Sequence, residues 1–441
     1  MSASLKLAGV ASIAVVVVKR GAPIAPFGVC ADDVPIGDTT LGEARAIALA
    51  ACGLAAPATK GTDDDVVSGP ALVLADDLWL TRRALRAFLT AAQALAPQRA
   101  TNAPAASQAA VRLRLPPSLF VSLTLPLQDL DSDDEGGATY PCAFVPAGVR
   151  MTAAEALRAP PCTIAYRELP TRVPVPRTLL PRAAGDDGAM QWPLTSTVAL
   201  RVRHWLHVLR ASHVAPQVWL IERALADPLR SSLRALLGVR LSAARREAAW
   251  RRQFVFRGRR CLVHPSAVIE GSVLGDDVVI GPGAVVLNSV IGAGSRLEQR
   301  THVSQCTLGP RTFMSLNSSM QACVTFADAD ACANNLQGCV VGARAGLTSF
   351  VRALDTTLDA DGRPGGAVRV ADGDVLRDAG VLPVGACFGP GAFVGANVTV
   401  AAGRVIPAGV VVVAGDGAIV THSDVAPGTY RTVGGRLVAL S

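Results

Sequence analysis

The chain has 441 residues, of which 50% are hydrophobic, 17% are charged and 4% are aromatic. This length predicts two or three domains, and the apolar content is sufficient for buried cores. The formal net charge is +7, but no recognised binding motif accompanies the basic residues, so we expect no nucleic-acid partner. The ten cysteines include no CxxC pair, which is typical of reduced thiols in a cytoplasmic protein.

The first apolar segment is the run over residues 7–18, which resembles a signal-peptide core. Lys19 and Arg20 follow it at once, and no pair of small residues marks a cleavage site at its end. The run is too short to span a bilayer, and its valine and isoleucine content favours a buried strand over 11–18. No other segment reaches transmembrane length, so we expect a soluble protein.

Residues 1–185 have the pattern of an α/β domain. The expected strands cover 11–18, 71–74, 111–125 and 140–145, and the expected helices cover 41–54 and 81–94. Residues 95–110 are rich in Ala, Pro and Gln and are expected to form a loop. The domain therefore alternates strands and helices, which is typical of a sheet covered by helices.

Asp76 and Asp77 stand at the end of the apolar segment that begins with the expected strand 71–74. A carboxylate at the carboxyl end of a strand faces the crevice where ligands bind in α/β sheets, and oxygen ligands suit Mg²⁺. These two residues are therefore candidate metal ligands. The alternative is that one of them caps the helix that begins near Thr81.

Residues 186–260 are expected to form an Arg-rich helical linker, which follows a proline-rich connector over 170–195. One helix is expected around 198–212 and another from 218 to about 252. The principal interpretation is an amphipathic linker with solvated arginines. The alternatives are peripheral contact with an anionic membrane surface and binding of a phosphorylated ligand.

The C-terminal region has a period of its own. Aliphatic residues recur at steps of five or six in Val263, Ile269, Leu274, Ile280, Val286, Ile291, Leu297, Val303, Leu308, Met314 and Met320. Three steps sum to 17 residues, and a second array from Leu382 to Val412 steps by six. A fixed short repeat predicts a solenoid, in which each coil stacks about 4.8 Å above the previous one. The register breaks between the arrays, where Asp-Gly pairs predict a β-hairpin excursion near 355–379.

Within this region, one segment resembles the left-handed β-helix of hexapeptide transferases and sugar-nucleotide pyrophosphorylases, namely His264-Pro-Ser-Ala-Val-Ile-Glu-Gly-Ser-Val-Leu-Gly-Asp-Asp-Val-Val-Ile-Gly-Pro-Gly-Ala-Val-Val286. An α/β domain, a helical linker and a parallel β-helix over 261–441 follow the order of the bifunctional N-acetylglucosamine-1-phosphate uridyltransferase/glucosamine-1-phosphate acetyltransferase family, to which the chain is similar as a divergent bacterial relative. The resemblance implies a domain that joins a sugar phosphate to a nucleotide with Mg²⁺, and a trimeric β-helix that takes an acetyl group from acyl-CoA.

The N-terminal domain departs from this family's pattern and is therefore expected to be a degenerate nucleotidyltransferase-like domain. The stretch 18–28 carries Lys19, Arg20 and two glycines, but not the glycine-rich phosphate loop. The two cations are candidate substrate ligands. The segment 71–80 resembles the strand whose terminal Asp holds the metal, which implies the Mg²⁺ role for Asp76 and Asp77.

In the β-helix, the resemblance implies acyl transfer, which needs a general base. His302 precedes the inward Val303 and is therefore expected to point outward, where clefts between neighbouring solenoids form; the alternative is an ordinary surface histidine. Amide side chains that could bind a substrate follow at Asn334, Asn335 and Gln337.

The sequence is compatible with three functions. The first is a transferase acting on a nucleotide-linked or phosphorylated sugar, by acyl transfer or by sugar-1-phosphate nucleotidyl transfer. The second is a non-catalytic protein that binds sugar nucleotides, and the third is an oligomeric scaffold. A homotrimer built on the β-helix is expected in each case.

Overall fold

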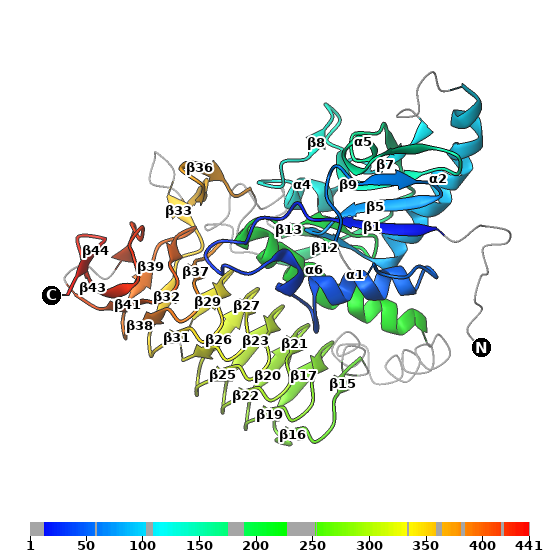
Figure 1. Cartoon of the computed structure of the whole chain (residues 1–441). Coiled ribbons are helices and arrows are strands. Elements are labelled where there is room, and N and C mark those ends of the chain that lie inside the picture. The colour runs from blue at the N-terminus through cyan, green and yellow to red at the C-terminus, as the bar shows by residue number, and fades with distance from the viewer. Residues whose placement is uncertain are drawn as a thin grey trace. The chain divides into compact units, whose positions relative to one another are not determined.

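The computed structural model describes residues 13–57, 60–102, 109–174, 189–226, 252, 254–332, 335–358, 364–380, 384–415 and 419–440. Contacts divide the chain into two compact units (Figure 1). The α/β unit comprises Met1–Ala22, Leu41–Glu168 and Thr197–Val202, and the β-helix unit comprises Pro23–Thr40, Leu169–Ser196 and Arg203–Ser441. Three consecutive ranges were expected from the sequence, whereas contacts group residues 23–40 and 169–196 with the β-helix.

The α/β unit is built on a mixed sheet with the strand order β1-β5-β9-β7-β11, and β8 pairs with β9. The bounds are β1 Ala14–Val18, β5 Ala71–Ala75, β7 Val111–Leu115, β8 Asp131–Ser132, β9 Ala138–Val145 and β11 Pro161–Thr163. β1 runs parallel to β5, while β9 runs antiparallel to β5 and β7. All residues of β5 and β9 are buried, as expected for central strands that are covered on both faces.

Four helices and two small ladders complete the described part of this unit. They are α1 Leu41–Ala50, α2 Arg82–Asn102, α4 Leu119–Thr124 and α5 Ala153–Ala156, with β4 Val66–Ser68 pairing β10 Arg150–Thr152, and β6 Leu78–Leu80 pairing β14 Ala199–Arg201. Two expectations are wrong here. The loop expected over 95–110 is helical as far as residue 102, and the strand expected over 111–125 ends at Leu115, because two prolines follow and Ser118 caps α4.

Helix α6, Trp205–Ala226, runs without a break through residues 213–217, where the two expected linker helices were separated. Residues 199–201 are strand instead of helix, and residues 227–250 lie outside the described residues. Because α6 contacts β24, β27 and β30 of the β-helix, its arginines are not all solvated: Arg210 is only 2% exposed. Burial also lowers the pKa of His213 to about 3. The helix is therefore a packed element of the β-helix unit and not a solvated linker.

The remaining non-solenoid elements of this unit are short. They are the 3-10 helix Ala31–Asp33, the hairpin β2 Pro35–Ile36 with β3 Thr39–Thr40, and the hairpin β12 Leu169–Pro174 with β13 Ala189–Leu194. The second hairpin lies where a connector without regular structure was expected. Phe27 stacks on Phe326 of the β-helix with ring centroids 4.5 Å apart, which explains why residues 23–40 belong to this unit. No helix among the described residues is both long and apolar enough to cross a membrane.

The C-terminal region is a left-handed β-helix with three faces (Figure 1). The first face contains β15 Phe256–Arg257, β18 Val273–Leu274, β21 Val290–Ile291, β24 Thr307–Leu308, β27 Val324–Thr325, β30 Val340–Val341, β37 Cys387–Phe388 and β40 Val405–Ile406. The second contains β16 Leu262–Val263, β19 Val279–Ile280, β22 Arg296–Leu297, β25 Phe313–Met314, β28 Asp330–Ala331, β31 Gly346–Leu347, β38 Phe393–Val394, β41 Val410–Val413, β43 Gly428–Val433 and β44 Arg436–Ala439. The third contains β17 Val268–Glu270, β20 Val285–Leu287, β23 His302–Ser304, β26 Ser319–Gln321 and β29 Leu336–Gln337, and it is continued by β32 Arg352–Ala353, β39 Thr399–Val400 and β42 Ile419–Val420.

The predicted 17-residue repeat is confirmed by the register of the third face. Ile269 pairs with Val286, Val286 with Val303, and Val303 with Met320, in parallel. Each of the four side chains is buried in the central stack. The alternation of a strand then directs the residues on either side of each inward side chain to the outer surface.

The predicted excursion is also confirmed. Two hairpins leave the wall after β32: β33 Thr357–Leu358 with β34 Pro364–Gly366, and β35 Arg369–Asp372 with β36 Val375–Asp378. Gly373 takes a positive φ of 60° in the second turn, while the Asp-Gly pair at 361–362 lies outside the described residues. His204 Nε2 donates a hydrogen bond of 2.9 Å to the Ala371 carbonyl, which ties this hairpin to the start of α6.

Candidate functional site

His302 lies on the outer side of the third face. In β23, Val303 is fully buried, whereas His302 and Ser304 on either side of it are partly exposed. Parallel pairing places Ser319 beside His302 and Gln321 beside Ser304 in the next rung. The orientation expected for His302 therefore follows from the alternation along one short strand.

Further polar residues continue the two outward-facing columns that begin with His302 and Ser304. Gln337 pairs with Gln321, and Asn335 forms a parallel bridge with Arg352. We call this set the outer polar strip; it consists of His302, Ser304, Ser319, Gln321, Asn335, Gln337 and Arg352. Successive rungs are about 4.8 Å apart, so Asn335 lies roughly 10 Å from His302 along the column. Asn334 lies outside the described residues.

The outer polar strip combines three kinds of chemistry on one surface. An imidazole is the side chain most often used as a general base, and hydroxyl and amide groups both donate and accept hydrogen bonds, as the hydroxyls of a sugar require. Arg352 is exposed and adds a guanidinium that suits phosphate. Sequence reasoning missed Ser304, Ser319, Gln321 and Arg352, although the 17-residue spacing from His302 to Ser319 was available as a signal.

The other described histidines of the β-helix lie near its ends and bond to local hydroxyl groups. His264 Nδ1 is 2.8 Å from Ser266 Oγ, and His422 Nδ1 is 2.9 Å from Thr421 Oγ1. Neither belongs to the outer polar strip. His302 is therefore the histidine that the fold combines with amide and hydroxyl neighbours.

In the α/β unit, Asp76 organises the loops at the carboxyl ends of β1 and β5. Its Oδ1 accepts backbone N–H groups of Arg20 at 2.9 Å and Gly21 at 2.8 Å, and its Oδ2 accepts Lys60 Nζ at 2.9 Å. Burial raises the pKa of this carboxyl, but the hydrogen bonds from Arg20, Lys60 and Gly21 outweigh burial and leave the pKa below its usual value. Asp76 is thus held as a carboxylate by nitrogen donors.

Asp77 is also paired with a cation. Arg201 Nε lies 2.8 Å from its buried Oδ2, and Arg45 donates to the backbone carbonyl of Asp76 at 2.8 Å. A Mg²⁺ ion bound to these carboxylates would stand beside an ammonium and a guanidinium group, and like charges at this range repel strongly. The donor set does not fit a divalent cation, and among the described residues no group of three or more His, Cys, Asp or Glu side chains is placed to hold a metal.

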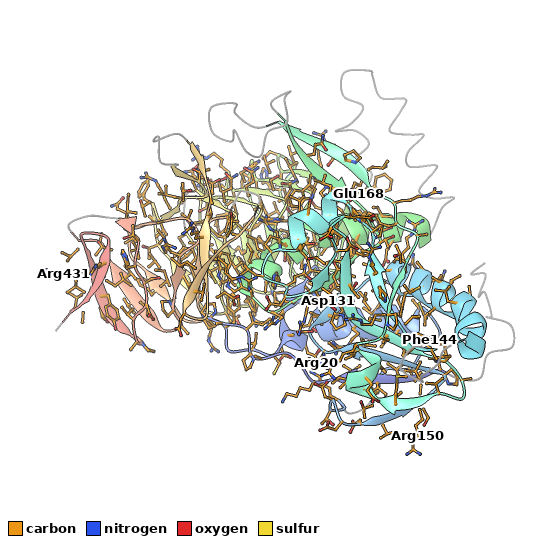
Figure 2. The ribbon with its side chains drawn as sticks, turned by 90° about the horizontal axis from the view of Figure 1, so that it is seen from above. Arg20, Asp131, Phe144, Arg150, Glu168 and Arg431 are labelled. Carbon is orange, nitrogen blue, oxygen red and sulfur yellow. The ribbon has the colours of Figure 1, made fainter. Side chains whose placement is uncertain are left out.

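The cations near these loops are more numerous than the sequence indicated. Arg20, whose position is labelled in Figure 2, pairs with Asp63 at 2.7 Å, and Lys19 is exposed beside it. Lys60 comes from a separate segment. It lies near these loops because its neighbour Gly61 pairs in parallel with Val18 at the end of β1. Sequence reasoning missed Lys60, although the Lys-Gly-Thr segment that contains it separates an apolar stretch from an acidic run.

Comparisons with known proteins give a short match. No protein-family model matches the chain. Over 56 residues the chain is 43% identical to the bifunctional protein GlmU of Burkholderia vietnamiensis (strain G4 / LMG 22486), and this stretch spans 12% of the chain and 12% of that protein. Together with the β-helix, this partial similarity fits the hexapeptide-repeat transferase superfamily.

Proposed function

We propose that the protein is a hexapeptide-repeat acyltransferase that acts on a phosphorylated or nucleotide-linked sugar at the outer polar strip. The observation that supports this proposal is the position of His302, which shares one face with hydroxyl, amide and guanidinium groups. A sugar presents hydroxyl groups to the amides, and its phosphate suits Arg352. Acyl-CoA is proposed as the donor substrate.

In the proposed reaction, His302 removes a proton from an amine or hydroxyl group of the acceptor. The acceptor atom attacks the thioester carbonyl carbon, so that a C–N or C–O bond forms and the C–S bond breaks. The proton passes from the imidazolium to the departing thiolate, and the products are the acylated sugar and the free thiol. Ser319, Gln321 and Gln337 orient the acceptor.

The test measures thiol release from acyl-CoA with a panel of amino sugars and nucleotide sugars. Removal of a general base slows turnover by roughly 10²–10⁴-fold, so His302→Ala should lose activity by this factor. The matched control is His422→Ala, which removes a β-helix histidine outside the strip and should keep the full rate. Undiminished turnover in His302→Ala excludes this residue as the base. If the wild-type protein releases no thiol with any acceptor, the proposal that it is an acyltransferase is wrong.

A second candidate, non-catalytic binding of a sugar nucleotide by the α/β unit, is favoured by one observation. Asp76 is engaged by N–H donors, while Lys19 and Arg20 flank the same loop. Cations at the carboxyl edge of β1 and β5 suit a pyrophosphate without a metal. A binder of this kind would raise the melting temperature in the presence of EDTA as much as in the presence of Mg²⁺. Stabilisation that requires Mg²⁺ would instead favour nucleotidyl transfer.

A further inference from the structure

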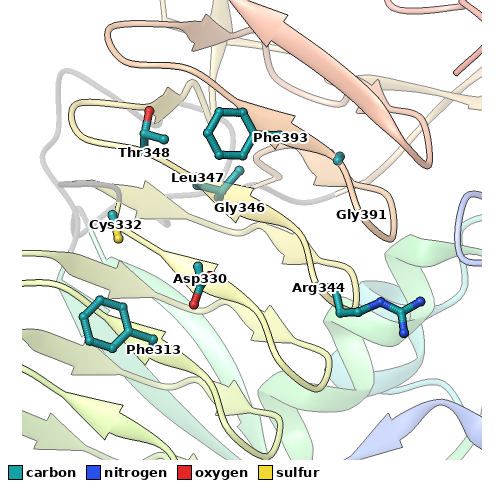
Figure 3. A pocket seen from close by; sticks show the side chains of 10 residues that line it. Phe313, Asp330, Cys332, Arg344, Gly346, Leu347, Thr348, Gly391 and Phe393 are labelled. Atoms are coloured by element: carbon teal, nitrogen blue, oxygen red, sulfur yellow. The ribbon is translucent and has the colours of Figure 1, made fainter. Parts of the chain in front are cut away.

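A pocket with a volume of about 370 Å³ lies on the outer side of the second face (Figure 3), whereas the outer polar strip lies on the third face. Its centre is a continuous column in which Phe313 pairs with Asp330, Asp330 with Gly346, and Gly346 with Phe393. The inward neighbours of these residues are buried, so the four positions face outward. The volume is at the small end of the range typical of ligand sites.

Gly346 leaves room for the ring of Phe393 in this column. The Cβ that any other residue would place here falls 2.9 Å from Cδ2 of Phe393, so the phenyl ring already lies over the glycine. Phe313 and Phe393 are three rungs apart, about 14 Å along the column. Because the ring of Phe393 is inclined towards Gly346, the open distance between the two rings is shortened to roughly two rungs. The open part of the pocket therefore lies above Asp330, between two aromatic rings.

We propose that this pocket binds a small organic cation, specifically an alkylammonium group held between Phe313 and Phe393 with Asp330 as its counter-charge. Aromatic rings attract a cation through the negative charge of their faces, and a carboxylate attracts it through its opposite charge. Asp330 is exposed at the position between the rings. The pocket thus combines the two groups that recognise an amine.

Arg344 also lines the pocket, but its charge is directed elsewhere. Figure 3 shows its guanidinium at the far end of the turn, extending away from Asp330 and the two rings. Asp328 occupies the same turn position one rung earlier, and its carboxyl pKa is lowered first by the hydrogen bond from Arg311 and also by the charge of Arg344. Asp328 is already held in an ion pair by Arg311, so Arg344 keeps its charge, but that charge extends away from the two rings and Asp330 is the charged group between them.

The experiment titrates the full chain with choline and, separately, with the neutral alcohol in which carbon replaces the choline nitrogen. Binding is measured by calorimetry and by ligand-observed NMR. Choline should bind and the alcohol should bind roughly 2- to 30-fold more weakly, which is the range that a cation–π contact provides. Asp330→Asn and Phe393→Leu should each weaken choline by a similar factor, and Gly346→Ala should weaken it by displacing the ring.

The variant Arg344→Gln tests whether the bound ligand carries a positive charge. Removal of a like charge should strengthen choline binding, whereas loss of affinity for choline in this variant would show that the ligand is not held as a cation beside Asp330 and would overturn the proposal. Equal affinity for choline and its neutral analogue would also overturn it, and so would the absence of choline binding at millimolar concentration. Acyl transfer is not part of the readout, so this outcome is independent of the function proposed for the outer polar strip.

Discussion

At the scale of single residues, the local placement of side chains could be predicted and their distant partners could not. His302 was expected to point outward because alternation along a strand depends only on its neighbour Val303. The ion pairs of Asp76 with Lys60 and of Asp77 with Arg201 join residues that are 16 and 124 positions apart. Such pairs depend on how separate segments meet, and for this reason the sequence indicated a metal site where the structure has cations.

The first prediction concerns Asp76. Its pKa in the folded chain lies below the usual 3.8, so its contribution to stability is complete above that pH and is lost as the pH falls through the lower folded value. Asp76→Asn should reduce the free energy of unfolding by about 2 kcal/mol at neutral pH, and the difference from wild type should shrink below pH 3.8. Urea unfolding at several pH values measures both effects.

The control for this prediction is Asp64→Asn, which neutralises an exposed carboxylate in a nearby loop. It should change stability by less than about 0.5 kcal/mol at every pH. If Asp76→Asn behaves like Asp64→Asn, the hydrogen bonds from Arg20, Gly21 and Lys60 do not anchor these loops.

At the scale of elements, the β-helix was predictable because each rung repeats one simple requirement, an inward aliphatic side chain. Helix α6 was not, because it lacks the polar face by which a surface helix is recognised. The outward residues of the first face beneath it, Thr307, Val324 and Val340, are fully buried, and tertiary packing of this kind overrides local patterns. The expected helix start at 198 and the expected break between 212 and 218 were wrong for that reason.

The second prediction tests the register of the β-helix. Ile280 is stacked between Val263 and Leu297 and is 2% exposed. Ile280→Asp would bury an unpaired carboxylate, which costs several kcal/mol, and should lower the melting temperature by roughly 5 °C or more. The matched control is Val279→Asp, because Val279 precedes Ile280 in the same strand and faces outward. Equal melting temperatures for the two variants would contradict the assigned register.

The third prediction concerns a column of cysteines at one corner of the β-helix. Cys306, Cys323 and Cys339 occupy equivalent positions, and each Sγ accepts the backbone N–H of the following rung at 3.4–3.5 Å. Burial raises the pKa of Cys323 and Cys339 well above the usual 9.0, so these thiols stay protonated. In the native protein a thiol reagent should label exposed Cys30 and leave the column unmodified, as mass spectrometry after digestion will show; rapid labelling of Cys323 would contradict this packing.

At the scale of the whole molecule, the fourth prediction is the assembly. We expect a homotrimer in which the outer polar strip of one copy faces a cleft formed with its neighbour. Light scattering at micromolar concentration should give three times the chain mass of 45.4 kDa. A mass of one chain would contradict both the trimer and any site shared between copies, whereas His302 and the pocket around Asp330 would remain available on the single chain.

The division of the chain has a consequence for biosynthesis. The polypeptide passes between the two units after residues 22, 40, 168, 196 and 202. Residues 23–40 therefore leave the ribosome long before β15 at Phe256–Arg257, the first strand of the β-helix with which they pack. At about 5–20 residues per second, translation of the intervening chain takes on the order of ten seconds or more. During that interval Phe27 lacks its partner Phe326, so the nascent N-terminal segment should be the part of this protein most dependent on chaperones during synthesis.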